Sequence, residues 1–185
     1  MNVRGIVEDS RVARIRELKA ELADAKARLV QTESDRDSLV AHFALALAAL
    51  RDFEQIGEGG ALRIIDGWNA ILRFRNVAKL TSEEVSALKA EYLSGLGIAA
   101  SSPAIPLTTW IVFDGPEENS YRSGPYRVTY TGGTGPQRAD RMILDYVHAA
   151  KILGIDIARI TVETADKALA KRLKSYGAAV EEFTS

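Results

Sequence analysis

The chain lacks cysteine entirely and contains only two histidines, His42 and His148, among its 185 residues. The absence of cysteine excludes disulfide bonds, thiol catalysis and zinc sites built on thiolates. With so few histidines, a multi-histidine metal site and a Ser-His-Asp triad are both poor interpretations. We therefore expect any catalytic chemistry to depend on carboxylates.

Long apolar runs and an excess of one charge are also missing. No run approaches the roughly 18 residues needed to cross a bilayer, and residues 1–9 contain no apolar secretion core. Lys and Arg number 24 against 25 Asp and Glu, a net charge of -1, which excludes a polycationic nucleic-acid coat. Apolar residues make up 46%, which is too many for a disordered chain. We expect a soluble, cytoplasmic protein with no membrane partner.

The segment 9–56 predicts a helix, because it holds no Gly or Pro and is rich in Ala, Leu, Arg and Glu. Residues 1–8 before it are expected to form an N-terminal tail. With Ile15 at heptad position a, the a and d positions are Ile15, Leu18, Leu22, Ala25, Leu29, Thr32, Arg36, Leu39, Phe43, Ala46, Leu50 and Phe53. So regular a seam indicates a coiled coil about 70 Å long. A single helix cannot bury such a stripe, so we expect a partner, and a second copy of the chain in a homodimer is the simplest one.

Two features of this segment allow other interpretations. The polar stretch 31–38 interrupts the seam at Thr32 and Arg36, and Ser34 with Asp37 resembles the capped start of a new helix. A hairpin of two shorter helices therefore remains an alternative, although the heptad register runs through the break unchanged. Residues 40–50 are apolar almost all round, which predicts contact with more than one neighbour.

Beyond a Gly-rich hinge at residues 57–60, the pattern changes to short apolar runs that alternate with helical segments. Strands are predicted at 61–65, 107–113, 126–130, 159–162 and 178–183, helices at 80–96 (capped by Ser82), 138–153 and 165–175, and a polar loop at 115–125. This alternation is typical of an α/β fold with a mainly parallel sheet and helices on both faces. Residues 61–185 are thus expected to form one globular domain.

Four aspartates mark the chain's exits from this predicted sheet. Asp66, Asp114 and Asp166 follow strands, and Asp140 opens a helix after a strand. Since parallel strands end at one edge, these carboxylates should converge there. Clustered carboxylates repel one another unless a cation is present, and they are the ligands preferred by Mg²⁺ or Mn²⁺. We therefore expect the four to form a metal site, with no organic cofactor.

Two polar neighbours support this site, and one simpler interpretation competes with it. Asn69 lies on the first turn after the first strand and can orient a ligand, and Thr164 can donate a hydrogen bond to one of the acids. The simpler interpretation is that an aspartate after a strand forms a turn or caps a helix. Sequence alone leaves both interpretations open for each aspartate.

Four motifs resemble the NYN domain, a PIN-like nuclease family, and its YacP-type branch in particular. They are Arg63–Ile71 (RIIDGWNAI), Trp110–Gly115 (WIVFDG), Val128–Tyr130 with Arg138–Asp140, and Ile160–Asp166 (ITVETAD), in the family's order over residues 61–183. The resemblance implies a PIN-like three-layer α/β/α fold and metal-dependent ribonuclease activity. Its catalytic residues carry over onto Asp66, Asn69, Asp114, Asp140 and Asp166.

Basic residues near these motifs are candidates for binding the phosphate backbone of RNA. They are Arg73, Arg75, Arg122, Arg138 and Arg141, with Thr164 as a further substrate-binding residue. A solvated surface with no such role is the alternative. The sequence thus predicts a metal-dependent endoribonuclease. A catalytically silent PIN-like module that binds RNA or a protein, and a nuclease that acts on DNA, remain as alternatives, because only the family resemblance favours RNA.

Overall fold

The computed structural model describes residues 3–72, 81–98, 106–133 and 137–182, with side chains from Arg16 onward apart from Ser82 and Glu182. The chain divides into two units, residues 1–43 and 44–185. The helices are α1 (Val3–Ile56), α2 (Gly67–Leu72), α3 (Ser82–Gly95), α4 (Arg138–Ile152) and α5 (Lys167–Tyr176), with a 3-10 turn at Ile157–Arg159. Among the described residues, no helix is both long enough and apolar enough to cross a bilayer.

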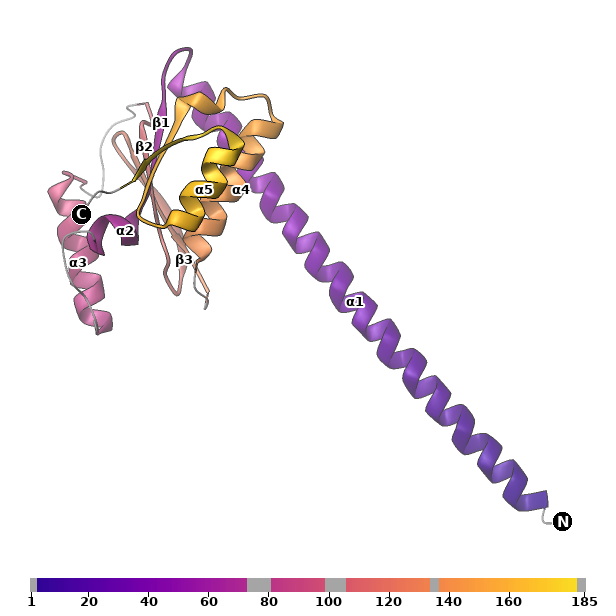
Figure 1. Ribbon diagram of the computed structural model, residues 1–185. Helices are drawn as coiled ribbons and strands as arrows, with labels where there is room; N and C mark the ends of the chain where they lie inside the picture. Colours follow the sequence, from indigo (N-terminus) through magenta and orange to yellow (C-terminus); the bar gives the residue numbers. More distant parts are fainter. Residues whose placement is uncertain (1–2, 73–80, 99–105, 134–136, 183–185) are drawn as a thin grey trace. The chain divides into compact units, whose positions relative to one another are not determined.

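A mostly parallel sheet forms the centre of the second unit (Figure 1). Its strands are β1 (Leu62–Asp66), β2 (Thr109–Phe113), β3 (Glu118–Ser123), β4 (Tyr126–Thr131), β5 (Ile160–Thr164) and β6 (Ala179–Glu182). They lie in the order β3-β4-β2-β1-β5-β6, and only β3 is antiparallel to its neighbour. The predicted α/β class is therefore confirmed. The carboxyl ends of the parallel strands meet at one edge, which we call the carboxyl edge.

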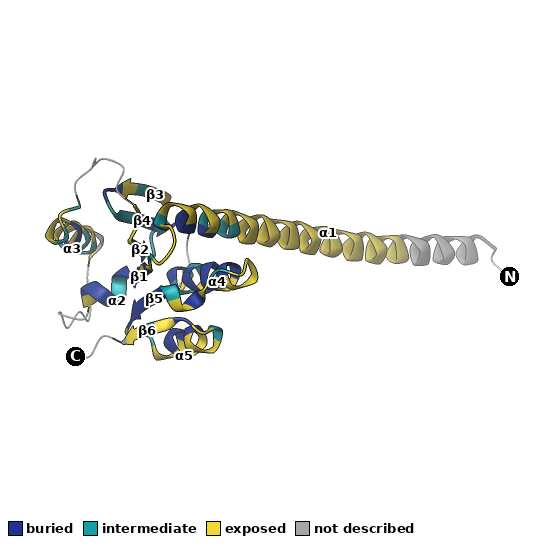
Figure 2. Ribbon diagram, turned by 90° about the horizontal axis from the view of Figure 1, so that it is seen from above, coloured by how far each residue is buried: buried dark blue, intermediate teal, exposed yellow. Residues whose placement is uncertain are grey.

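Helices cover both faces of this sheet, because strand residues alternate between two apolar clusters. On one face, Ile64, Trp110 and Val162 pack against α4, α5 and the last turns of α1. On the other face, Ile65 and Ile111 pack against α2 and α3. The second unit is thus a three-layer α/β/α arrangement, whose buried residues Figure 2 shows in dark blue.

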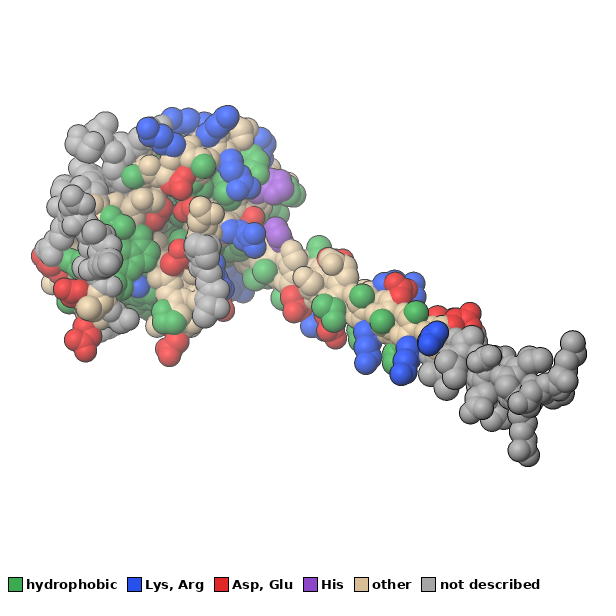
Figure 3. Space-filling view, turned by 60° about the horizontal axis from the view of Figure 1, so that its bottom comes forward, with side chains coloured by type: hydrophobic (Ala, Val, Ile, Leu, Met, Phe, Trp, Pro, Cys, Tyr) green, Lys and Arg blue, Asp and Glu red, His purple; other side chains and the backbone are tan. Residues whose placement is uncertain are grey.

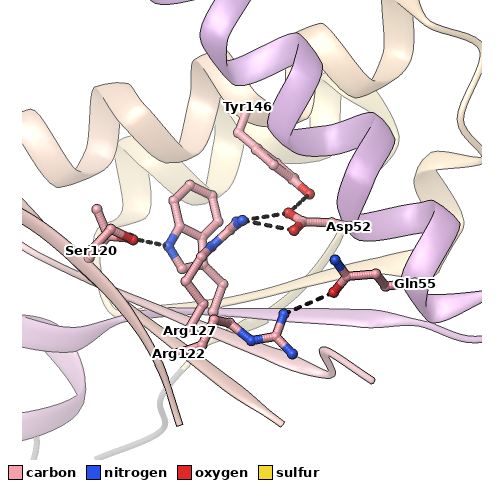
Figure 4. Close-up of polar contacts among 8 residues, drawn as sticks. Asp52, Gln55, Ser120, Arg122, Arg127 and Tyr146 are labelled. Atoms are coloured by element: carbon pink, nitrogen blue, oxygen red, sulfur yellow. Dashed lines mark hydrogen bonds and ion pairs between the residues drawn. The ribbon is translucent and has the colours of Figure 1, made fainter. Parts of the chain in front are cut away.

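A buried ion pair fixes the last turns of α1 to the sheet (Figure 4). Asp52 on α1 is 5% exposed, accepts a hydrogen bond of 2.8 Å from Arg127 on β4, and accepts another of 2.7 Å from the Tyr146 hydroxyl on α4. The guanidinium carbon of Arg127 lies 4.2 Å from the centre of the Trp110 ring. Burial, followed by the charge of Asp52, raises the pKa of Tyr146, so this hydroxyl stays a hydrogen-bond donor.

The structure differs from the sequence prediction at three places. α1 is one continuous helix from Val3, so residues 3–8 are not a separate tail and the hairpin alternative is wrong. The predicted loop at 115–125 contains β3, a polar and largely exposed edge strand that pairs with β4. Helix α3 is capped by Thr81 instead of Ser82, through a capping box with Glu84.

Candidate functional site

Asp66 lies at the carboxyl edge, at the last position of β1, and is 3% exposed. Its carboxylate accepts hydrogen bonds from the backbone N–H of Asn69 at 3.3 Å, from the Asn69 side-chain amide, and from the Thr164 hydroxyl at 3.2 Å. Burial raises the pKa of Asp66, these hydrogen bonds lower it, and the charge of Asp114 raises it further. Asn69 and Thr164 therefore hold this carboxylate in place from the first turn of α2 and the end of β5.

The glycine after Asp66 has a packing role. A Cβ atom at Gly67 would lie 2.3 Å from Cε1 of the Phe113 ring, at the end of β2. The Asp-Gly pair therefore allows α2 to begin directly after β1 while Phe113 fills the space beside it. This close approach connects the position of Asp66 to the packing of the neighbouring strand.

Asp114 and Asp166 act as caps at the N-termini of the two helices on one face of the sheet. Oδ1 of Asp114, one residue beyond β2, accepts hydrogen bonds from the backbone N–H of Ala139 at 2.7 Å and from the Thr131 hydroxyl at 3.2 Å. Oδ1 of Asp166 accepts hydrogen bonds from the backbone N–H groups of Ala168 and Leu169 at 2.7 and 2.9 Å. The capping interpretation is therefore confirmed for Asp166, which is the N-cap residue of α5, whereas Asp114 accepts from the start of α4 although Gln137 is the N-cap residue of that helix.

Asp140 connects the four acids. It lies half-buried in the first turn of α4, and its pKa is raised from 3.8 to about 6, first by burial and then by the charges of Asp66, Asp166 and Asp114. A hydrogen bond with Asp66 contributes in the same direction. The carboxylates from the two strand ends and the two helix starts thus lie close enough to interact. Asp140 therefore keeps its proton to a higher pH than an ordinary aspartate does.

A partly buried lysine lies beside this cluster and was not identified from the sequence. Nζ of Lys89, on α3, donates to the carbonyl oxygen of Asp114 at 3.2 Å. It lies 4.9 Å from the ring centre of Trp68, 5.1 Å from that of Tyr130 and 5.5 Å from that of Phe113. Burial lowers the pKa of Lys89. Only its proximity in the fold connects it to the acids, since α3 is distant from them in sequence.

The predicted basic residues have different locations. Arg138 donates to the carbonyl oxygen of Thr131 at 3.1 Å, which places it at the carboxyl edge, and the exposed Arg141 follows one turn later on α4. Arg122 pairs with Arg127 near the start of β4 and donates to Gln55. It therefore lies at the opposite end of the sheet, and its predicted position beside the site is wrong. Arg73 and Arg75 lie outside the described residues.

Sequence analysis also missed a basic helix that begins at the site. Helix α5 follows Asp166 and carries four exposed cations and no acid: Lys167, Lys171, Arg172 and Lys174. Lys167, Lys171 and Lys174 recur at i, i+4 and i+7, so they lie along one line of the helix. Figure 3 shows Lys and Arg side chains gathered along one border of the second unit. The sequence KALAKRLK at residues 167–174 already indicated this basic surface.

These observations alone identify neither a metal site nor the protein family of the chain. Over the part of the chain that the structure describes, no three His, Cys, Asp or Glu side chains are arranged as a group that could hold a metal ion. No family model matches the chain, and neither a curated protein nor a solved structure matches it. The argument for function therefore depends on the geometry of the carboxyl edge.

Proposed function

We propose that this protein is a metal-dependent endoribonuclease whose second unit is an NYN-type, PIN-like nuclease domain. One observation carries the proposal: four aspartates from separate elements meet at the carboxyl edge, where Asp66 ends β1, Asp114 binds the start of α4 from beyond β2, and Asp140 and Asp166 lie at the starts of α4 and α5. Four acids from separate elements that repel one another at one edge of a sheet cost stability. Such an arrangement is typical of a site that binds a cation.

The donor set fits Mg²⁺ or Mn²⁺, which favour carboxylate oxygens. Asp66, Asp114, Asp140 and Asp166 would hold the ion. The helix-capping hydrogen bonds of Asp114 and Asp166 use Oδ1. When bound, such an ion would supply positive charge beside a scissile phosphate and acidify a nearby water. In the absence of such an ion, a proton on Asp140 would relieve part of the repulsion.

The chain's own residues have distinct roles in this proposal. Asn69 and Thr164 orient the carboxylate of Asp66 through their hydrogen bonds, so they are positioning residues. Asp140 would be a ligand of the ion, and the positive charge of the ion would lower its raised pKa and keep it ionised. The Lys89 ammonium, beside Asp114, is placed to attract a phosphate oxygen.

The basic line on α5 favours a nucleic-acid substrate. Its lysines begin one residue after Asp166 and give a positive surface on a chain whose net charge is -1. One helical turn rises about 5.4 Å, so successive lysines can contact successive phosphates of a single strand. Binding that depends on such contacts weakens as salt rises, by roughly 0.7 in log K per phosphate for each tenfold change in salt.

The decisive experiment is cleavage of labelled single-stranded RNA and DNA by the purified chain with Mn²⁺ or Mg²⁺. We expect RNA cleavage that D66N abolishes and that D37N, a matched Asp→Asn change at an exposed position of α1, leaves intact. Full activity of D66N, or no cleavage by the natural chain with either metal, would refute the proposal. Cleavage of DNA but not of RNA would support the proposed active site and identify DNA as the substrate.

A catalytically silent binding module is the second candidate, favoured by the basic line on α5, which could bind phosphates without any metal. The two candidates differ in their response to metal. The nuclease predicts that Mn²⁺ raises the melting temperature and that D66N/D140N loses this rise. The silent module predicts salt-sensitive RNA binding with no effect of Mn²⁺ on melting.

A further inference from the structure

Aromatic side chains lie beside the acids at the carboxyl edge, on the face of the sheet that carries α2 and α3 (Figure 1). Trp68 follows Asp66 by two residues on α2, and Tyr130 is the next-to-last residue of β4; both are partly exposed. The fully buried ring of Phe113 joins them. It meets the Trp68 ring edge-on at 6.3 Å between centres and stacks on the Tyr130 ring at 5.5 Å. This row of three rings therefore runs from the core to the surface beside Asp66.

The ammonium group of Lys89 adds a positive charge to the row. Its Nζ lies within 5.5 Å of all three ring centres and is closest to that of Trp68, at 4.9 Å. The same Nζ donates to the carbonyl oxygen of Asp114 at 3.2 Å, which holds it at the carboxyl edge. Attraction between a cation and aromatic faces keeps such an arrangement together. The surface beside the acids thus combines a flat aromatic ring with a positive charge.

The second tryptophan of the chain shows how an indole is used when it only packs. Trp110 is 2% exposed, and its indole N–H donates to the Thr129 hydroxyl at 2.9 Å. These contacts account for Trp110 within the core. Trp68 keeps accessible ring surface although Lys89 lies over its ring. Partly exposed tryptophan is enriched at binding surfaces, because one large rigid ring supplies much contact area.

The combination of ring and cation restricts the chemistry of a ligand. A cationic ligand would compete with Lys89 for the same aromatic faces. A small inorganic anion would use the positive charge but not the rings, and an aliphatic ligand would use the rings but not the charge. A nucleotide uses both, because its base stacks on an aromatic ring while its phosphate is attracted by the cation.

We propose that Trp68 stacks on an unpaired base of a single-stranded nucleic acid, with Lys89 beside the neighbouring phosphate. Bases within a duplex are already stacked, so this site favours single strands over duplexes. Every base has an aromatic face, so the contact tolerates changes of sequence. The proposal rests on the proposed function, since the stacked base belongs to a nucleotide bound at the carboxyl edge. Its tests measure binding and need no cleavage.

Tryptophan fluorescence reports this contact directly, because a base that stacks on an indole quenches its emission. With a chelator present, we expect a short oligoadenylate to quench the emission of the natural chain until binding saturates. An abasic strand of the same length offers phosphates without bases, and a duplex of oligoadenylate with oligouridylate offers only paired bases, so neither should quench. W68F, which retains only the emission of Trp110, should show no quenching. No quenching of the natural chain by oligoadenylate, or equal quenching by the abasic strand or in W68F, would overturn the proposal.

Two substitutions separate stacking from packing. Phenylalanine at position 68 can still stack on a base, whereas leucine is apolar but has no aromatic face. By fluorescence anisotropy of labelled oligoadenylate, we expect W68F to bind within about threefold of the natural chain and W68L to bind about tenfold more weakly. Y126L is the matched control, because Tyr126 packs against the same cluster but begins β4 at the opposite end of the sheet. It should leave the dissociation constant unchanged. Equal affinities of W68F and W68L would show that Trp68 only packs.

These measurements also distinguish failure of this proposal from failure of the proposed function. Quenching and the loss of affinity in W68L, without cleavage of RNA or DNA by any metal-loaded chain, would leave the stacking site in place and refute the nuclease. Cleavage by a natural chain whose emission oligoadenylate does not quench would support the nuclease and refute the stacking site.

Discussion

The raised pKa of Asp140 makes the stability of the cation-free protein depend on pH. Its pKa of about 6 against 3.8 in an ordinary carboxyl corresponds to about 3 kcal/mol at 1.36 kcal/mol per pKa unit. Because the side chain is only half-buried, solvent screening reduces this to roughly 1–2 kcal/mol. The folded state holds the proton more tightly than the unfolded chain does. The contribution is therefore complete below pH 3.8 and is lost as the pH rises through about 6.

D140N isolates this contribution, because asparagine has nearly the same shape and does not ionise. In the presence of a chelator, we expect D140N and the natural chain to unfold at similar urea concentrations at pH 4. At pH 7 the variant should be more stable by roughly 1–2 kcal/mol, since it avoids the repulsion. Urea unfolding between pH 4 and pH 8 measures the difference. D37N, at an exposed aspartate of α1, should show no such divergence.

Metal adds a second arm to this experiment. A divalent cation should stabilise the natural chain at pH 7, where Asp140 is ionised, and much less at pH 5, where a proton occupies it. D140N should lose most of that stabilisation. If the unfolding curves of D140N and the natural chain keep a constant separation from pH 4 to pH 8, Asp140 does not interact with the other acids, and the argument for the site fails.

Three further changes test other parts of the structure. D52A leaves Arg127 buried without its partner and should lower the free energy of unfolding by about 3–5 kcal/mol. The control E54A changes an exposed residue two positions later and should change this free energy by less than about 0.5 kcal/mol. Equal urea midpoints for the two variants would contradict the ion pair. G67A forces a Cβ against Phe113, so it should lower both the melting temperature and RNA cleavage, whereas G95A, where a Cβ meets open space, should change neither. K89M in a D66N background should weaken RNA binding about tenfold, which is about 1.4 kcal/mol. Fluorescence anisotropy of labelled RNA measures this binding, and an unchanged dissociation constant would show that Lys89 does not contact the substrate.

The fold was predictable where apolar residues report burial directly. Val112 lies in the continuous apolar run WIVF, and Ile64 and Val162 lie in shorter runs rich in β-branched residues, which predict buried parallel strands. Each of the three belongs to the core. The same rule failed for β3, whose ENSYRS sequence has no apolar alternation because an edge strand can expose most of its side chains. The cap of α3 was missed by one residue, although the Thr81–Glu84 spacing is that of a capping box.

The candidate site was predictable only in part, for a geometric reason. Strand ends in a parallel sheet share an edge, so the meeting of Asp66 and Asp114 followed from the strand prediction. Lys89 and the Asp52–Arg127 pair were not predictable, because their partners lie far away in sequence. In sequence, Asp52 lies outside the a and d positions of the expected coiled coil, and nothing local indicates that it is buried.

The capping and metal-binding interpretations of the aspartates do not exclude each other. A capping hydrogen bond occupies one carboxylate oxygen and directs the group toward a helix N-terminus, where the helix dipole favours negative charge. Asp114 and Asp166 are held in this way, and Asp66 is held by Asn69 and Thr164. Asp140 opens its own helix and shares a hydrogen bond with Asp66 instead. Three of the carboxylates are thus fixed by donors, and the metal proposal predicts that the ionisation of Asp140 responds most to an added cation.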